Sequence, residues 1–238
     1  MMSETMTTAS YSAALELMEA RPMLGDSGLA SAKYNFLLGP GECALIECRD
    51  AVQRTQFVDV CTGVLPTGEG SVKCMGLDWK DLEERQVWAL RGRIGRVFSS
   101  GNWIDLYGTH MNVMWPRLHH SSTDLDVLVE EAVKLGIRFG LPGLPIQPPG
   151  RLSALDRRRA EYIRAFLGKP SLLLLEDPVS LQPEGLYEAF LSELTAAMQR
   201  GCAVVWIASD HAVWHDYVKE NMQVFRLGDS GLMEMRSA

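Results

Sequence analysis

The segment from Leu45 to Phe57 lies where the neighbouring residues predict a phosphate-binding loop, but it lacks the residues that such a loop uses. A turn at Gly41 and the apolar run 44–46 precede it, which is the usual approach to such a loop. The loop pattern is Gly-x-x-x-x-Gly-Lys-Ser/Thr, because backbone N–H groups must close on the phosphates and a lysine must reach the terminal ones. In this chain the pattern positions hold Glu47, Val52, Gln53 and Arg54, with Thr55 directly after them. The sequence therefore has the frame of a phosphate site and predicts that its chemistry is lost.

Charge opposes phosphate binding in this segment as strongly as shape does. Glu47 and Asp50 would face a polyphosphate, and each carboxylate–phosphate pair costs roughly 3 kcal/mol at about 5 Å and an effective dielectric near 20. Val52 places a β-branched side chain where glycine lets the backbone approach its ligand. Arg49 and Arg54 could restore binding by supplying cations, or they could pair with the two acids and fill the pocket with protein. We expect the second arrangement.

A pair of adjacent acids forms the second group with chemical potential. The apolar run Leu172–Leu175 predicts a buried strand, and Glu176 and Asp177 follow it directly. Two carboxylates at a strand end can hold magnesium and orient an attacking water. Without a bound nucleotide we expect them to be a solvated strand end.

A third motif is the run Ser153, Ala154, Leu155 and Asp156, which opens a predicted helix. A serine at the N-cap with an acid three residues later is a capping box, so a structural role is sufficient to explain it. A helix N-terminus is also an anion-binding element, so a weakened phosphate contact through Ser153 stays open.

The order of these motifs resembles the nucleotide-binding subunits of ATP-binding-cassette (ABC) transporters. Leu152–Asp156 lies where that family has Leu-Ser-Gly-Gly-Gln, just before the strand with the paired acids, and Ile94–Ile104 is similar to the family's Q-loop. The continuation through Asn112 to Pro116 is closest to the ATPases of MCE/Mla-type lipid transport systems. The resemblance runs from about Leu15 to Met235, and it implies an α/β fold with a mixed sheet, a parallel core with an antiparallel β part, covered by helices, plus an inserted helical subdomain.

The resemblance also implies how each motif departs from an active site. The order Glu176-Asp177 inverts the family's Asp-Glu, which moves both carboxylates by over about an ångström and can cost about a hundredfold in rate. Leu155 and Asp156 replace residues that let the segment clasp a partner's terminal phosphate. Ser99 stands at the Q-loop glutamine, and His211 comes one residue after the position of the switch histidine.

Two weaker departures support the same interpretation. Residues 21–25 offer only Leu24 where the family stacks adenine on an aromatic ring, and residues 180–183 lack the aspartate of the D-loop. No catalytic element is intact, so we expect no bound cofactor. His211 and His215 have helical i, i+4 spacing but no third ligand, so we predict surface residues and no metal site.

Alternating patterns predict the elements that position these residues. We expect strands near 15–17, 35–38, 44–46, 69–74, 94–98, 172–175 and 202–207, and helices near 51–60, 82–90, 123–135, 153–167 and 183–198. Residues 141–150 predict a linker because prolines and glycines are dense there, and residues 223–235 predict a closing hairpin with its turn at 228–231. The domain prediction is a frayed N-terminus (1–14), a core of RecA-like and antiparallel β parts (15–98 and 152–238) and a helical subdomain (99–151).

Composition restricts the class of protein. The 238 residues carry a net charge of −7, which argues against a nucleic-acid partner because such proteins normally have a basic surface. The chain has no run of about eighteen apolar residues that would cross a membrane. The five cysteines lack metal or disulfide spacing, which predicts buried reduced thiols.

The combined expectation is a catalytically degenerate ABC-type nucleotide-binding domain, a pseudo-ATPase kept for its shape. The resemblance implies a membrane permease and a competent ATPase subunit or second copy as partners, in the cytoplasm at the inner face of the cell membrane. An active but divergent ATPase and a soluble scaffold without a transporter remain alternatives.

The apolar residues after Phe98 are the predicted surface for the permease. They are Asn102, Trp103, Ile104 and Leu106, with Trp115 after the next short helix. Large apolar residues in a loop that contains Gly and Asn are typical of an interface anchor. The alternative is that Trp103 and Trp115 pack the helical insert.

Overall fold

The computed structural model describes residues 13–23, 29, 32–179, 184–214, 217 and 222–235. Its strands are β1 (Leu15–Pro22), β2 (Tyr34–Leu38), β3 (Cys43–Glu47), β4 (Thr67–Cys74), β5 (Leu77–Asp78), β6 (Ile94–Val97), β7 (Leu172–Glu176), β8 (Ala203–Ala208), β9 (Gln223–Gly228) and β10 (Gly231–Glu234). Its α-helices are α1 (Ala51–Cys61), α2 (Glu84–Arg91), α3 (Thr109–His120), α4 (Leu125–Arg138), α5 (Ala154–Phe166) and α6 (Glu184–Gln199). Short 3₁₀ helices are η2 (Trp79–Asp81), η3 (Pro149–Arg151) and η4 (His211–Trp214).

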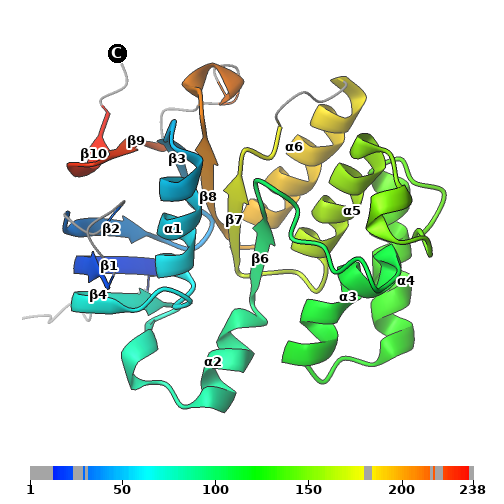
Figure 1. Ribbon diagram of the computed structural model, residues 1–238, viewed down its shortest axis with the longest axis horizontal. Coiled ribbons are helices and arrows are strands. Elements are labelled where there is room, and N and C mark those ends of the chain that lie inside the picture. The colour runs from blue at the N-terminus through cyan, green and yellow to red at the C-terminus, as the bar shows by residue number, and fades with distance from the viewer. Residues whose placement is uncertain are drawn as a thin grey trace, which may run out of the picture.

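Two sheets organise the described residues (Figure 1). The larger has the order β10-β9-β3-β8-β7-β6, parallel throughout except for the antiparallel β9–β10 hairpin. The smaller is antiparallel, in the order β2-β1-β4-β5. The predicted α/β class with a parallel core and an antiparallel part is confirmed.

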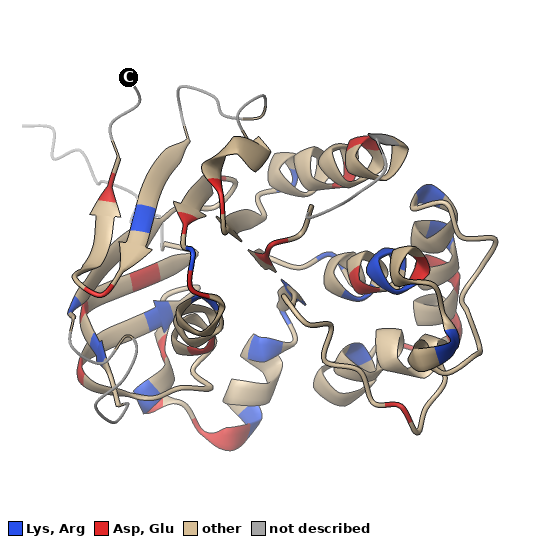
Figure 2. Cartoon of the chain, turned by 45° about the horizontal axis from the view of Figure 1, so that its top comes forward, with Lys and Arg blue, Asp and Glu red and all other residues tan. Residues whose placement is uncertain are grey.

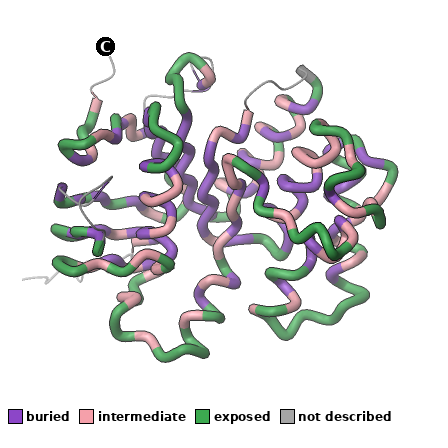
Figure 3. Tube along the Cα trace, in the orientation of Figure 1, coloured by how far each residue is buried: buried purple, intermediate pink, exposed green. Residues whose placement is uncertain are grey.

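The parallel sheet is buried on both faces, which explains its continuous apolar runs. Side chains alternate along a strand, so Leu173 and Leu175 of β7 join one core with α3 to α6. Leu172 and Leu174 face the other core, which holds α1 and the antiparallel sheet. In Figure 3 the buried strands of this sheet lie between the antiparallel sheet on one side and the helices α3 to α6 on the other. Because neighbouring strands here run parallel, their carboxyl ends meet at one edge of the sheet, which is formed by β3, β6, β7 and β8. Charged segments gather at this edge (Figure 2).

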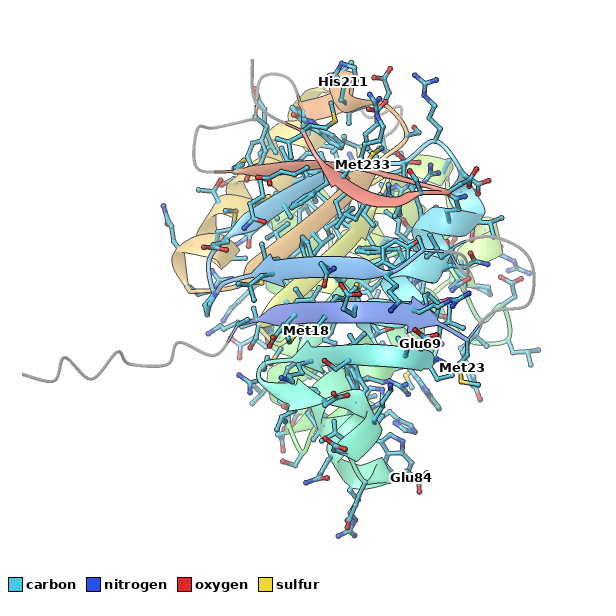
Figure 4. The ribbon with its side chains drawn as sticks, turned by 90° about the vertical axis from the view of Figure 1, so that its left-hand side faces the viewer. Met18, Met23, Glu69, Glu84, His211 and Met233 are labelled. Carbon is cyan, nitrogen blue, oxygen red and sulfur yellow. The ribbon has the colours of Figure 1, made fainter. Side chains whose placement is uncertain are left out.

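The outer face of the antiparallel sheet is open, as Figure 4 shows. Met18 of β1 is 51% exposed there, and Glu69 of β4 forms ion pairs with Arg21 and Lys33.

Three details of the sequence-based expectation change. Trp115 lies inside α3 rather than after a short helix, and α3 continues through Pro116 to His120. Strand β5 and η2 were not predicted, because two or three residues carry no detectable period. Ala14, within the segment expected to fray, is already buried beside β1, whereas residues 1–12 lie outside the described part.

The remaining expected elements are present within a few residues. The residues of the described ranges include no helix long and apolar enough to cross a membrane. The five cysteines are free and buried, as predicted. Burial raises the pKa of the Cys48 thiol, the one in the loop after β3, to about 11.

Candidate functional site

The loop between β3 and α1 is short, and the chain caps it with its own anion. Only Cys48, Arg49 and Asp50 separate the strand from the helix. The Asp50 carboxylate accepts hydrogen bonds from the backbone N–H groups of Val52 and Gln53, at 2.7 and 3.0 Å. Helix N-terminal N–H groups are the donors that hold a phosphate in a phosphate-binding loop. Here a carboxylate from the chain already satisfies two of them.

Arg54 lies buried behind this cap and faces the end of β7. Its Nη1 donates to the carbonyls of Cys48 and Arg49, at 2.6 and 3.2 Å. Its Nη2 lies 2.7 Å from Oδ2 of Asp177, and the Arg54 side chain is only 6% exposed. The expectation that Arg54 would pair with Glu47 or Asp50 is therefore wrong, because those acids have other partners.

Glu47 is held mainly by an arginine from β9. The carboxylate is buried and accepts from Nε and Nη2 of Arg226 at 3.1 and 2.9 Å, because parallel pairing of β3 and β9 places the two residues opposite each other. Arg49, the expected partner, lies 3.9 Å away and its side chain is 88% exposed. His211 Nδ1 is 3.8 Å from the same carboxylate.

A hollow of about 400 Å³ lies beside this ion pair. Its lining includes Asp50, Gln53 and Asp229, and Gln53 Nε2 donates to Asp229 Oδ1 at 2.6 Å. His211 lies on η4 and is exposed, as predicted, whereas His215 lies outside the described residues.

Glu176 is fully buried, so the expectation of a solvated strand end is wrong. Its carboxylate accepts from Arg96 Nε at 2.8 Å, from Thr55 Oγ1 at 2.7 Å and from Ser99 Oγ at 3.2 Å. Arg96 extends the network to Asp59 of α1 at 2.6 Å. A carboxylate that water cannot reach is stable only if hydrogen-bond donors satisfy its oxygens, as they do here.

Sequence reasoning missed Arg96. The available signal was a single arginine in the short apolar strand Ile94–Val97. The segment 180–183, expected to be a shortened D-loop, and Leu24 at the adenine position lie outside the described residues.

Ser153 caps α5 as the capping-box pattern predicts. Its Oγ accepts from the Asp156 backbone N–H at 3.0 Å and lies 2.9 Å from Oδ2 of the same residue. Asp156 also pairs with Arg159 at 2.8 Å. Ala154 and Leu155 fill the first turn of α5, and Leu155 is partly buried against the core.

The loop after Phe98 and the following helix α3 carry exposed apolar residues, but their exposure differs. Leu106 is 93% exposed, Ile104 is 43% exposed and Trp115 is 41% exposed. Asn102 is exposed with a positive φ of 45°, whereas Trp103 is half-buried and packs against the core. The two alternatives for the tryptophans therefore divide: Trp103 packs inward, and Trp115 lies at the surface.

Aromatic residues that the sequence argument did not select extend this surface. Tyr107 stacks on Trp115, with ring centroids 5.4 Å apart and planes 20° apart. Trp88 of α2 meets His119 of α3 edge-on at 5.4 Å. We name the exposed residues Ile104, Leu106, Tyr107 and Trp115 the apolar face.

The chain is similar in sequence to several known ATP-binding proteins. No family model matches the chain. It is 29% identical over 154 residues to "Phosphonates import ATP-binding protein PhnC 1" of Ruegeria sp. (strain TM1040), which covers 61% of this chain and 55% of that protein. It is 25% identical over 219 residues to "Lipoprotein-releasing system ATP-binding protein LolD 1" of Rhodopirellula baltica, covering 92% of this chain and 94% of that protein.

A lipid-transport relative is also found. The chain is 25% identical over 175 residues to "Intermembrane phospholipid transport system ATP-binding protein MlaF" of Haemophilus influenzae, covering 72% of this chain and 66% of that protein. The match thus spans little more than half of the phosphonate-import relative but nearly all of LolD 1.

Solved structures show the same fold. The dimeric bacterial ABC transporter cassette MJ0796 superposes with a TM-score of 0.77 at 18% identity, over 94% of this chain and all of that chain (100%). An ATP-binding subunit of an ABC transporter gives a TM-score of 0.78 at 13% identity, over 92% and 87% of the two chains. The protein has the ABC ATPase cassette fold, and its sequence is similar to those of ATP-binding proteins of transport systems.

Proposed function

We propose that this protein is a catalytically degenerate ABC-type nucleotide-binding domain that serves as a structural subunit of a membrane transport complex. The observation that carries the proposal is that its own side chains take the places of the ligands. Asp50 caps the helix N-terminus that would hold phosphate, and Arg54 pairs with Asp177 at the strand end where an ABC ATPase holds magnesium. ATP·Mg does not fit these residues as they stand.

Binding of ATP·Mg would require several local changes at once. Phosphate oxygens would have to replace the Asp50 carboxylate at the α1 N–H groups, and that carboxylate and Glu47 would then repel the phosphates. A magnesium ion near Asp177 would have to displace a buried guanidinium that also binds the Cys48 carbonyl. Removing one member of a buried, hydrogen-bonded ion pair typically costs about 3–5 kcal/mol. These energetic costs lower the affinity of the protein for ATP·Mg.

The proposed partners follow from the relatives and from the exposed surface. PhnC, LolD and MlaF are named as ATP-binding proteins of import, lipoprotein-releasing and phospholipid transport systems. We assign the apolar face to a permease subunit and propose that the protein is a peripheral subunit at the inner side of the cell membrane. A competent ATPase subunit or a second copy would complete the pair, and the cargo would be a lipid if the likeness to MlaF extends to function.

Calorimetric titration of the pure full-length chain with ATP and magnesium tests the proposal. We expect no heat of binding at micromolar nucleotide, and an ABC cassette with an intact phosphate loop serves as the positive control. Micromolar affinity would overturn the assignment. Purification of the protein from its own cells, with identification of the co-purifying chains, tests the partner: a membrane permease is expected, and its repeated absence favours a soluble scaffold.

One contact favours a second candidate, an active but divergent ATPase. Thr55 follows the expected hydroxyl position by one residue, and its Oγ1 lies 2.7 Å from Glu176. A hydroxyl and a carboxylate at this edge are a pair that can share a magnesium ion. Magnesium-dependent ATP hydrolysis that is lost in Thr55→Val would support this candidate over the first.

A further inference from the structure

An arginine of α5 contacts and holds the segment that leads into the apolar face. Arg164 donates from Nη2 to the Gly101 carbonyl at 2.6 Å and from Nη1 to the Asn102 carbonyl at 3.1 Å. Its guanidinium also lies 4.5 Å from the centroid of the Trp103 ring and 5.2 Å from that of Phe98. One side chain thus contacts four of the six residues from 98 to 103.

The backbone at this point leaves little freedom for another arrangement. Gly101 has a φ of +82°, and a Cβ there would lie 2.7 Å from Trp103 Nε1 and 2.8 Å from Glu161 Oε1. Asn102 follows with a φ of +45°. The buried Glu161 accepts from the Trp103 side chain and pairs with Arg158 at 2.6 Å. Only glycine fits at position 101, and asparagine is one of the few other residues that readily adopts the positive φ seen at position 102.

The same contacts continue to the strand-end network. Arg96 lies 4.3 Å from the centroid of the Phe98 ring while its Nε binds Glu176 at 2.8 Å. Ser99, the first residue after Phe98, also hydrogen-bonds to Glu176. Two side chains, those of Arg96 and Ser99, therefore join the loop after Phe98 to Glu176 at the end of β7. We name Arg96, Phe98, Trp103, Glu161 and Arg164 the loop clamp.

Burial of the Arg164 guanidinium makes its charge costly unless its contacts stabilise it. Burial lowers the pKa of Arg164 to about 10, which means that the charged form is held at a desolvation cost that its contacts must offset. A planar guanidinium binds two carbonyls with a rigid fork of donors while its face stacks on rings, whereas an ammonium group has no plane to stack.

We propose that Arg164 is a positioning residue whose loop clamp fixes the segment 98–107, and with it Ile104, Leu106 and Tyr107 of the apolar face, in one conformation that does not depend on ATP or magnesium. This inference rests on the proposed function. In a complex, the permease-binding surface of this chain is then always presented, and any nucleotide-driven movement comes from the partner ATPase.

Hydrogen–deuterium exchange of the full chain tests the proposal directly. The amides of Ile104 and Tyr107 donate to Asn112 Oδ1 and to the Ile104 carbonyl, so peptides covering 98–107 report the position of the loop. We expect slow exchange that millimolar ATP·Mg leaves unchanged. Arg164→Gln should accelerate exchange of these peptides by on the order of tenfold, because charge-assisted bonds are lost, while peptides of β7 and β8 stay unchanged.

The controls separate positioning from general stability. Arg164→Lys keeps the charge but loses the planar fork, so its loop exchange should fall between wild type and Arg164→Gln; it also carries the test where Arg164→Gln does not fold. Arg200→Gln, at an exposed arginine after α6, should match wild type. Loop exchange unaltered in both Arg164 variants, or altered more than about twofold by ATP·Mg in wild type, overturns the proposal.

The same samples distinguish failure of this inference from failure of the proposed function. Calorimetric ATP binding with unchanged loop exchange overturns the pseudo-ATPase assignment and leaves the loop clamp intact. No ATP binding with unaltered exchange in the Arg164 variants overturns the loop clamp and leaves the assignment intact.

Discussion

Arg54 and Asp177 form a buried ion pair, with 2.7 Å between Nη2 and Oδ2, that joins the start of α1 to the end of β7. Asp177 is fixed further by the Ser209 backbone N–H, which donates to its Oδ1 at 2.8 Å. The pair therefore connects the ends of β3, β7 and β8 across the edge where an ABC ATPase holds its nucleotide. A guanidinium is a fixed cation of the protein, so this connection does not require a metal ion.

Arg54→Ala should lower the free energy of unfolding by about 3 kcal/mol or more, because it removes the cation that pairs with the largely buried Asp177 and the hydrogen bonds to two carbonyls. Urea denaturation of the pure protein measures the change. Arg49→Ala is the matched control: its side chain is 88% exposed, and a change within about 0.5 kcal/mol is expected. Equal effects of the two substitutions would show that the buried pair has no special weight.

Gln53→Lys alone should produce no steady ATP turnover. The new ammonium group would find Asp229, which now accepts from Gln53 Nε2, and Asp50 would still cap α1. Catalytic groups that act as a unit must be restored together. A phosphate-release assay against the Gln53→Ala background measures the effect, and sustained turnover by the single variant would show that the site is close to activity.

Leu106→Asp and Trp115→Ala should each weaken assembly with a permease by about 2 kcal/mol and leave the melting temperature nearly unchanged, because both side chains project from the surface. Ile137→Asp on α4, also an exposed apolar residue, should leave assembly unchanged. Quantitative co-purification and thermal melting provide the two measurements. Undiminished assembly in both variants would remove the apolar face as the docking surface.

Trp103→Ala should weaken docking and also lower the melting temperature, because the indole is half-buried between Arg164 and the core. Trp103 remains a proposed docking residue only through its effect on the loop that it supports.

Glu161 should make stability depend on pH in the acidic range. Burial raises the pKa of its carboxyl above the ordinary 4.5. An acid whose pKa is higher in the folded state contributes stability that is fully present below its unfolded pKa and is lost as pH rises through the folded pKa. Glu161→Gln should remove this decrease, as urea denaturation at a series of pH values would show.

Glu130→Gln is the control for that measurement. Lys134 lowers the pKa of the exposed Glu130 carboxyl, so its contribution has the opposite sign and is lost as pH falls. The same slope in wild type and Glu161→Gln would contradict the assignment of the pH dependence to Glu161.

The local pattern of the sequence was enough for the elements and for part of the site. The four leucines of β7, the turn between β9 and β10 and the N-cap at Ser153 depend on neighbours within a few residues, so composition and period reveal them. The departures from the phosphate-loop pattern were likewise readable, because such a motif is a run of adjacent positions. Docking through residues 102–106 stays a prediction.

The partners of the charged residues were decided only by the tertiary structure. Arg54 meets Asp177, Glu47 meets Arg226 and Glu176 meets Arg96, and each pair joins two strands or a strand and a helix that are distant in sequence. The sequence predicted the wrong partners for Arg54 and a solvated Glu176, because it shows which charges exist but not which strand ends meet. Strand order brings these ends together, and burial then requires every carboxylate there to have a cation or a donor. Local residues therefore determined that the phosphate loop departs from its pattern, and the packing of the parallel sheet determined which side chains took its place.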